Sequence, residues 1–178
     1  KQEGVELVVV GDAQAPPPAG VDVAIVLGGD GTMLRALHRF LGTGIPVVGV
    51  NFGRVGFLSA IPRDELERGV ARVFAGGREV VALATLDVDA GGTRFVAVND
   101  AVVASADLGR MVELEWSIGR EDFGRVPCDG LICSTPSGST AYNLSNGGPV
   151  LMWGLDAMAL TFVAPHDLRA RQFVVPRG

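Results

Sequence analysis

The chain has 178 residues, of which 48% are hydrophobic and 20% charged, and its formal net charge is −5. This length allows one domain or two small ones with a real core, and the composition excludes a disordered chain. No apolar run reaches the roughly 18–20 residues that span a bilayer, and no leader segment is recognisable. No clustered basic face indicates nucleic-acid binding. We therefore expect a cytoplasmic protein with neither a membrane nor a nucleic-acid partner.

The cysteines argue against a zinc site, and the glycines indicate where a ligand site could lie. The two cysteines, Cys128 and Cys133, do not make a zinc site, which needs about four ligands, and we expect both to be reduced. Glycine is abundant at 25 residues, and many glycines cluster between apolar runs. Because glycine lets the backbone turn tightly or approach a ligand closely, these clusters are the first candidates for a site.

The first part of the chain has the pattern of an α/β domain. Apolar runs at Glu6–Val10, Val21–Leu27 and Ile45–Val50 predict strands. Apolar residues at helical spacing predict a helix over residues 34–41, between the second and third of these strands. A strand, a glycine turn, a helix and a strand make a βαβ unit, so its strands should be parallel. A second helix is predicted over Arg63–Phe74, after which Gly76 and Gly77 end it.

The second part is mostly β, and we place the boundary near residue 77, giving domains 1–77 and 78–178. A polar turn and then a short helix beginning near Ser139 are expected among the strands. Gly91 and Gly92 indicate a hairpin between the first two strands. The predicted strands are Val80–Asp89, Thr93–Ser105, Met111–Ile118, Gly130–Ser134, Met158–Ala164 and Gln172–Val175.

The first motif that carries chemistry is the turn between the second strand and the first helix, which reads GGDGT. The start of a helix offers free backbone N–H groups and a partial positive charge, which suit a phosphate group. Asp30 is the only acid in this turn, and its carboxylate could accept a proton from a hydroxyl group that attacks phosphorus. Alternatively, Asp30 only caps the helix. The common nucleotide motifs GxxxxGK[ST] and GxGxxG are absent.

Three further segments combine glycine or polar residues with strand ends. Asn51–Leu58 puts a second glycine loop at the same edge of the sheet, unless it is an ordinary connection. Asn99 and Asp100 interrupt an apolar strand, and they either form a turn or bind a polar ligand such as a ribose. Asp129–Ser145 is rich in small hydroxyl residues and contains Tyr142, the only tyrosine, whose ring can stack on a base. Its alternative role is a Ser/Thr turn that caps a helix.

Together these motifs resemble those of NAD kinases, in the order in which that family carries them, over nearly all of the chain from about Val5 to Val175. GGDGT is shared with lipid kinases and phosphofructokinases, whereas the stretch STPSGSTAY is much more specific. The resemblance implies a Rossmann-like N-terminal domain followed by a mostly-β C-terminal domain. It implies transfer of a phosphoryl group from ATP or polyphosphate to the 2′-hydroxyl of the adenosine ribose of NAD, with Mg²⁺. It also implies a homodimer or homotetramer.

The resemblance also assigns roles to residues. Asp30 is the implied proton acceptor, and Asp30 and Gly31 also touch NAD. Asn99 and Asp100 bind its ribose–adenine part, Arg110 is a basic ligand contact, and Asp129 holds the nicotinamide end. The residues implied to line the adenine pocket are Thr140, Ala141, Tyr142, Asn143, Leu144 and Ser145. The glycine turn that holds the phosphate donor comprises Gly28, Gly29, Gly31 and Thr32.

The sequence departs from the family pattern at a few positions. Asp100 stands where the family usually has glutamate, Pro127 where a basic residue is frequent, and Gln172 where proline is usual. Two alternative functions stay open: a lipid or sugar kinase of the same superfamily, and a catalytically inactive NAD-binding module. A lipid kinase would carry a PxGTxND-like loop, where this chain has NFGRVGFLS.

Overall fold

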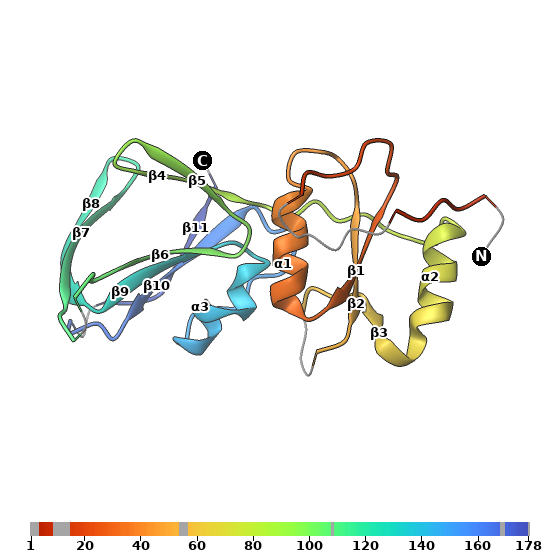
Figure 1. Ribbon diagram of the computed structural model, residues 1–178. Helices are drawn as coiled ribbons and strands as arrows, with labels where there is room; N and C mark the ends of the chain where they lie inside the picture. Colours follow the sequence, from red (N-terminus) through yellow and green to blue (C-terminus); the bar gives the residue numbers. More distant parts are fainter. Residues whose placement is uncertain (1–3, 9–14, 54–56, 108, 168–169, 178) are drawn as a thin grey trace. The chain divides into compact units, whose positions relative to one another are not determined.

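A computed structural model describes residues 4–8, 15–53, 57–107, 109–167 and 170–177 (Figure 1). The chain divides into two compact units, residues 1–80 (unit 1) and 81–178 (unit 2). The division lies close to the boundary predicted near residue 77. Unit 1 mixes helices with strands, and unit 2 consists mostly of strands, so the predicted fold class is confirmed.

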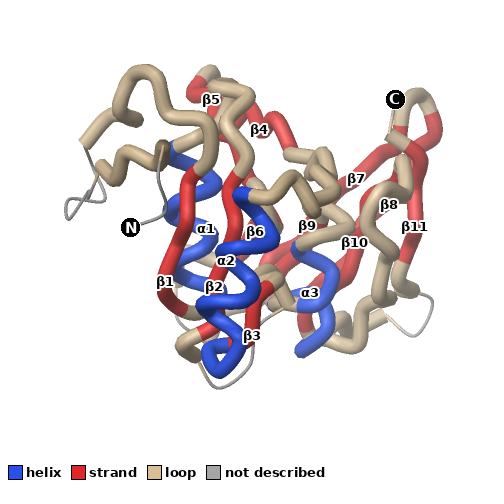
Figure 2. Tube along the Cα trace, turned by 90° about the vertical axis from the view of Figure 1, so that its right-hand side faces the viewer, coloured by secondary structure: helices blue, strands red, loops and turns tan. Residues whose placement is uncertain are grey.

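Unit 1 is built on a three-stranded parallel sheet of order β1-β2-β3, with β1 at Ala24–Gly28, β2 at Val47–Asn51 and β3 at Ile61–Pro62. Helix α1 (Asp30–Arg39) connects β1 to β2, which confirms the predicted βαβ unit. Figures 1 and 2 place α1 and α2 (Leu66–Phe74) on opposite faces of this sheet. The parallel pairing brings the carboxyl ends of β1 and β2 to the same edge.

The core of unit 1 lies between the sheet and α2. Val50, Ile61 and Val73 are buried there, and partly buried aliphatic side chains surround them. Gly69 of α2 lies directly over Ile61, since a Cβ atom at this glycine would stand 2.5 Å from the Ile61 Cγ2 atom. The absence of a side chain at residue 69 therefore lets the helix approach β3 closely.

Two predictions for unit 1 need correction. The predicted strand Glu6–Val10 is wrong for residues 6–8, which are exposed and form no strand, and residues 9 and 10 lie outside the described part. Leu7 is 81% exposed, so its side chain is not part of a core between strands. The predicted helix from Arg63 instead starts as a 3₁₀ turn, η1 (Arg63–Glu65), and becomes α-helical at Leu66.

Unit 2 contains a four-stranded sheet of order β11-β10-β9-β6 and two hairpins, β4–β5 and β7–β8. Within the described residues, the strands of unit 2 pair antiparallel. The helical segments are short: η2 at Gly138–Thr140 and α3 at Tyr142–Ser145. The strands are β4 (Leu86–Ala90), β5 (Thr93–Ala97), β6 (Asp100–Ala104), β7 (Val112–Ile118), β8 (Glu121–Cys128), β9 (Gly130–Ser134), β10 (Ala157–Val163) and β11 (Phe173–Pro176).

Most strands of unit 2 were predicted, with three differences. The run Val80–Asp89 forms a strand only from Leu86 onward. The run Thr93–Ser105 is two strands, because β5 pairs with β4 while β6 pairs with β9 in a different sheet. Strand β8 was not predicted, since Gly124, Pro127 and several charged residues give its sequence the character of a loop.

Hairpin β7–β8 packs on the large sheet through aromatic side chains. The ring of Trp116 stacks on Phe123 at a centroid distance of 4.5 Å. It also meets Phe162 of β10 and Phe173 of β11 edge-on, at 5.5 and 4.9 Å. These contacts make the hairpin and the sheet two layers around a shared aromatic core.

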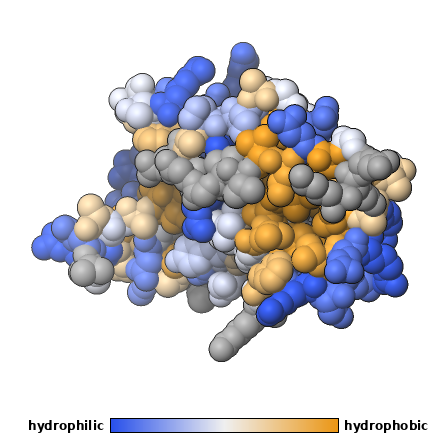
Figure 3. All heavy atoms as spheres, turned by 45° about the vertical axis from the view of Figure 1, so that its right-hand side comes forward, coloured by the Kyte–Doolittle hydropathy of each residue, from blue (hydrophilic) through white to orange (hydrophobic). Residues whose placement is uncertain are grey.

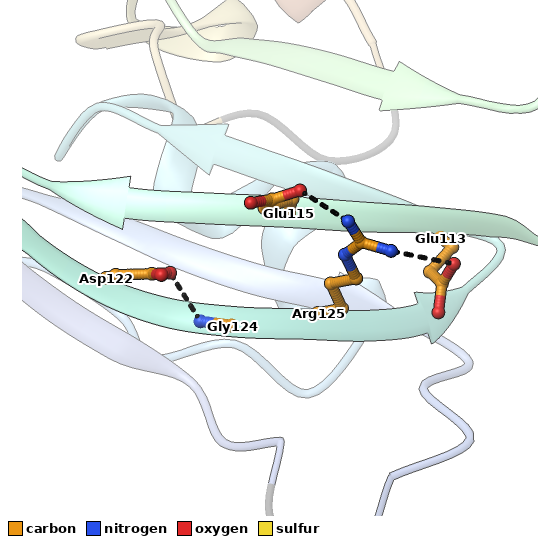
Figure 4. A network of polar contacts seen from close by, with 5 residues as sticks. All are labelled: Glu113, Glu115, Asp122, Gly124 and Arg125. Carbon is orange, nitrogen blue, oxygen red and sulfur yellow. Dashed lines mark hydrogen bonds and ion pairs between the residues drawn. The ribbon is translucent and has the colours of Figure 1, made fainter.

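The other face of the same hairpin is exposed and charged. Arg125 of β8 reaches Glu115 and Glu113 of β7, with nitrogen–oxygen distances of 3.1 and 4.0 Å (Figure 4). The two glutamates alternate along β7 with Leu114 and Trp116, which point to the core. Since all three charged side chains are more than half exposed, these ion pairs contribute little to stability.

Apolar residues also reach the surface, and one face of the molecule displays a continuous hydrophobic area (Figure 3). Exposed large side chains of unit 1 include Leu27, Phe52 and Phe57. Folded proteins expose much apolar surface, so such residues do not by themselves identify a binding site. No helix of the described residues is long and apolar enough to cross a membrane.

Ile61 tests the core of unit 1. Ile61→Ala removes a side chain that is only 3% exposed, so we expect the unfolding free energy of this unit to fall by about 2–5 kcal/mol. Val80→Ala, at a position 63% exposed in the same unit, should change it by less than about 0.5 kcal/mol. Urea unfolding monitored by hydrogen exchange measures both, and equal effects would contradict this assignment of the core.

Candidate functional site

The turn between β1 and α1 is tightly packed at Gly28. A Cβ atom at Gly28 would lie 2.6 Å from the Cβ atom of Thr32, so no other residue fits there without a shift. Gly29 is the N-cap residue of α1, and its carbonyl oxygen accepts hydrogen bonds from the N–H groups of Thr32 and Met33, at 2.9 and 3.0 Å. The helix therefore starts immediately after the strand, with Asp30 as its first residue.

Asp30 is held by the second glycine loop. Its Oδ2 atom accepts a hydrogen bond from the N–H of Phe57 at 3.0 Å, and its Oδ1 atom accepts one from Leu58 at 3.3 Å. The alternative role of a helix cap is wrong, because α1 has no side-chain cap hydrogen bond and both oxygens reach across to the loop. The two N–H donors fix the orientation of the carboxylate at the start of the helix. Each oxygen still has a lone pair for a further contact.

The loop after β2 lies at the same edge of the sheet, as expected for Asn51–Leu58. The N–H of Phe52 donates to the carbonyl oxygen of Gly28 at 3.0 Å, and the Asn51 side chain accepts from Gly53 at 2.8 Å. The guanidinium of Arg63 lies 5.1 Å from the centre of the Phe52 ring. Residues 54–56 of the loop lie outside the described part. Unit 1 thus gathers a glycine turn, a positioned carboxylate and a helix N-terminus in one place.

In unit 2, Asn99 and Asp100 lie where β6 begins, and both are half-buried. The side-chain Oδ1 atom of Asn99 is buried, and no described residue forms a hydrogen bond with it. Burial raises the pKa of the Asp100 carboxyl above its ordinary value of 3.8. Unpaired buried acceptors and desolvated acids are costly in a folded protein, so their occurrence at adjacent positions indicates a functional site.

The turn after β9 packs against these residues. The side chains of Thr135 and Ser137 both donate to the carbonyl oxygen of Val98, at 2.7 and 3.1 Å. A Cβ atom at Gly138 would lie 2.0 Å from the carbonyl oxygen of Asn99, so this glycine lets the two segments touch. Sequence reasoning singled out the run Asp129–Ser145 for its small hydroxyl residues, but it assigned no individual role to Thr135, Ser137 or Gly138.

The predicted adenine-pocket residues differ in exposure. Tyr142, Leu144 and Ser145 are exposed, whereas Thr140 and Ala141 are half-buried. These five residues flank the buried Asn143 along η2 and α3, and none of them is fully buried.

Asn143, by contrast, is fully buried, and its side chain is used inside the protein. Its amide nitrogen donates to the carbonyl oxygens of Ser139 and Pro149, at 3.0 and 2.9 Å. Its Oδ1 atom accepts from Thr161 of β10 at 2.7 Å. Gly148 leaves room for it, since a Cβ atom there would stand 2.0 Å from Asn143 Oδ1. These bonds tie α3 to the large sheet, and they account for Asn143 without a ligand.

Asp129 and Arg110 complete the predicted residues of unit 2. Asp129 is exposed at the single-residue break between β8 and β9, where its N–H donates to Val163 at 2.9 Å. Arg110 lies in the connection before β7 and forms an exposed ion pair with Asp107 at 3.6 Å. The contacts of these two residues do not link them to Asn99 or to the turn after β9.

The donor set for a metal ion is sparse. Within the described part of the chain, no group of three or more His, Cys, Asp and Glu side chains could hold a metal ion. Both cysteines are free thiols, as predicted, and burial raises the pKa of each. A cation beside Asp30 would therefore need most of its ligands from a bound substrate or from water.

The fold and the turn after β1 define a two-part α/β protein whose strand-to-helix glycine turn suits phosphate groups. Residues 8–78 match the ATP-NAD kinase N-terminal domain family, and residues 98–178 match the ATP-NAD kinase C-terminal domain family. The chain belongs to the NAD kinase family.

Individual relatives agree with this membership. A protein of Gemmatimonas aurantiaca named NAD kinase is 42% identical over 162 residues, which cover 88% of this chain and 56% of that protein. The crystal structure of yeast NADH kinase with NADH has a TM-score of 0.76 at 28% identity, over 88% of this chain and 48% of that one.

An NAD kinase from Archaeoglobus fulgidus, whose structure was solved in complex with ATP, has a TM-score of 0.78 at 29% identity. The match covers 87% of this chain and 61% of that one. The chain thus spans little more than half the length of the curated relatives that it matches.

Asp100 links the site to pH-dependent stability. The folded chain binds this proton more tightly than the unfolded chain, so the ionised carboxylate destabilises the fold above the raised folded-state pKa. This penalty disappears as pH falls through that pKa to below 3.8. We expect Asp100→Asn to raise the melting temperature at pH 7, with the difference from wild type shrinking toward acidic pH.

Melting curves between pH 7 and 3.5 measure this difference. Asp87→Asn, at an exposed position of β4, is the matched control and should show neither effect. A lower melting temperature for Asp100→Asn at pH 7 would mean that native contacts of the carboxylate outweigh its desolvation.

Proposed function

We propose that this protein transfers the γ-phosphoryl group of ATP to the 2′-hydroxyl of the adenosine ribose of NAD, giving NADP and ADP. The observation that carries the proposal is the Asp30 carboxylate at the start of α1, which the backbone N–H groups of Phe57 and Leu58 hold beside the glycine turn. Membership of the NAD kinase family supports the choice of substrates. The relatives solved with NADH and with ATP support both as ligands.

In the proposed reaction, the 2′-hydroxyl oxygen attacks the γ-phosphorus, and the bond from this phosphorus to the bridging oxygen breaks. The hydroxyl proton passes to Asp30, and ADP leaves with the bridging oxygen. Such transfers are catalysed chiefly by positioning and by stabilising charge. The hydrogen bonds from Phe57 and Leu58 support this role, because they aim the carboxylate while leaving a lone pair on each oxygen.

The remaining residues would position the two ligands. The phosphate donor would lie against the turn formed by Gly28, Gly29, Gly31 and Thr32, where the helix start favours negative charge. Asn99 and Asp100 would bind the ribose–adenine part of NAD, Arg110 would supply a basic contact, and Asp129 would hold the nicotinamide end. The proposed adenine-binding segment comprises Thr140, Ala141, Tyr142, Leu144 and Ser145, with Asn143 as its internal support.

The donor set fits Mg²⁺ that arrives with the phosphate donor. Magnesium is commonly bound by one or two carboxylates together with substrate phosphates, and Asp30 is the carboxylate at the glycine turn. Bound there, Mg²⁺ would neutralise charge on the donor phosphates. Polyphosphate is a second possible donor. We further propose a cytoplasmic protein that assembles as a homodimer or homotetramer.

Asp30→Asn tests the assignment of the base. Asparagine keeps the size of the side chain but cannot accept the hydroxyl proton, so we expect NADP formation to fall by a factor of roughly 10²–10⁴. Asp22→Asn, at an exposed position just before β1, is the matched control and should keep the wild-type rate. An NADP-specific dehydrogenase assay with ATP, polyphosphate, NAD and NADH measures the product.

The alternatives give different results in the same experiment. Equal rates for Asp30→Asn and wild type would contradict the role of Asp30. Calorimetric binding of NAD without turnover on any donor would favour an inactive binding module. Phosphorylation of diacylglycerol or a sugar phosphate, with none of NAD, would favour the lipid or sugar kinase.

A further inference from the structure

The backbone of Asn99 is held from outside its own strand. Strands β6 and β9 pair up to Asp100 and Ser134, and one more backbone hydrogen bond extends the ladder, from the N–H of Thr135 to the carbonyl oxygen of Asn99 at 2.8 Å. The Ser134 hydroxyl lies 3.5 Å from the same oxygen. The end of β9 and the turn after it therefore hydrogen-bond to Asn99, the residue that precedes β6.

The Thr135 hydroxyl takes part in several of the hydrogen bonds between this turn and residues 98 and 99. Thr135 is 1% exposed, and its Oγ1 atom is 2.7 Å from the carbonyl oxygen of Val98 and 3.0 Å from that of Asn99. It also accepts a hydrogen bond from the N–H of Gly138 at 3.0 Å. Because one hydroxyl proton serves two carbonyl oxygens, this side chain ties both of them to the turn.

The turn also packs closely against the backbone of Asn99. Gly138 packs on it so closely that a Cβ atom would stand 2.6 Å from the Asn99 Cα atom, besides meeting the carbonyl oxygen. Ser137, 4% exposed, lies 3.0 Å from the Thr135 hydroxyl and donates to Val98. Buried hydrogen-bond networks of this kind hold a single backbone arrangement.

The same residue carries a side-chain oxygen without a partner. Asn99 Oδ1 is buried and makes no hydrogen bond with the described residues, whereas its backbone carbonyl lies within reach of three donors. A buried acceptor left unpaired is rare in native proteins and calls for a ligand or water as donor. The backbone contacts thus determine where this acceptor is presented.

We propose that Thr135 is a positioning residue: its buried hydroxyl holds the backbone of Val98 and Asn99, so that the Asn99 side chain meets NAD in one orientation. This inference rests on the proposed function, because it takes NAD as the molecule that Asn99 binds. Thr135 itself does not touch the ligand. Its removal should weaken the binding of NAD without weakening that of ATP, whose proposed turn lies in unit 1.

Three variants test this role. Thr135→Val keeps the shape but loses the hydroxyl, Thr135→Ser keeps the hydroxyl, and Thr43→Val removes a hydroxyl that only closes a loop in unit 1, where it donates to Phe40 at 2.7 Å. We expect Thr135→Val to raise the dissociation constant and the KM for NAD about tenfold, as for the loss of one buried hydrogen bond. The value of kcat and the KM for ATP should stay within about twofold, since only uniform binding is lost.

The control and rescue variants decide whether the hydroxyl is responsible. Thr135→Ser and Thr43→Val should both bind NAD within about twofold of wild type, as for neutral substitutions. Equal losses in Thr135→Ser and Thr135→Val would overturn the inference, as would a lower melting temperature of Thr135→Val with unchanged affinity for NAD. If the valine variant does not fold, Thr135→Ala takes its place in every comparison.

A measurement without any ligand separates this inference from the proposed function. In ¹H–¹⁵N NMR spectra, the side-chain amide signals of Asn99 should move in Thr135→Val and stay in place in Thr43→Val. Unmoved signals in Thr135→Val overturn the positioning role, whatever the protein binds. If the signals move while wild type neither binds NAD nor forms NADP, the proposed function fails and the positioning of Asn99 stands.

Discussion

The pair of hydrogen bonds from the N–H groups of Phe57 and Leu58 to the Asp30 carboxylate is the interaction on which the site of unit 1 depends. It exists because β1 and β2 run parallel, so that the turn after one strand and the loop after the other reach the same edge. Without these donors, a carboxylate in the first turn of a helix would point toward water or cap the helix. With them, it is an oriented acceptor beside the glycine turn, as proton transfer from a hydroxyl group requires.

In unit 2, the hydrogen bonds at Asn99 are made by the backbone and not by the side-chain oxygen, the reverse of those at Asp30. The backbone carbonyl oxygen of Asn99 lies within hydrogen-bond distance of three donors, whereas no described residue bonds to its side-chain oxygen. An unpaired buried acceptor costs about 1–3 kcal/mol, and the raised pKa of the neighbouring Asp100 shows a second cost of desolvation. The buried hydroxyls of Thr135 and Ser137 donate hydrogen bonds to the backbone of Val98. The two costly groups are therefore the Asn99 side-chain oxygen and the Asp100 carboxyl, which would meet a ligand.

The predictable features of this chain are those that depend on local spacing. The period change after Asp30 predicted α1, and the apolar runs on either side predicted the parallel pair β1 and β2. Features set by distant partners were missed. Strand β8 has a loop-like sequence, and its Phe123 packs against Trp116 of β7. Residues 93–105 form two strands because β5 pairs with β4 while β6 pairs with β9. For the same reason, Asp30 could be singled out as a candidate, but its donors from residues 57 and 58 could not.

The costs at Asn99 and Asp100 have a thermodynamic consequence for unit 2. A ligand that supplies a donor to Asn99 Oδ1 and a partner to Asp100 removes both penalties at once, so its binding energy includes the relief of strain that the free protein carries. Binding of this kind stabilises the folded state in proportion to ligand concentration over its dissociation constant. Because the penalties lie on two adjacent residues at the start of β6, the stabilisation should be greatest where β6 and β9 pair, next to the hydrogen bond from the Thr135 hydroxyl to Asn99.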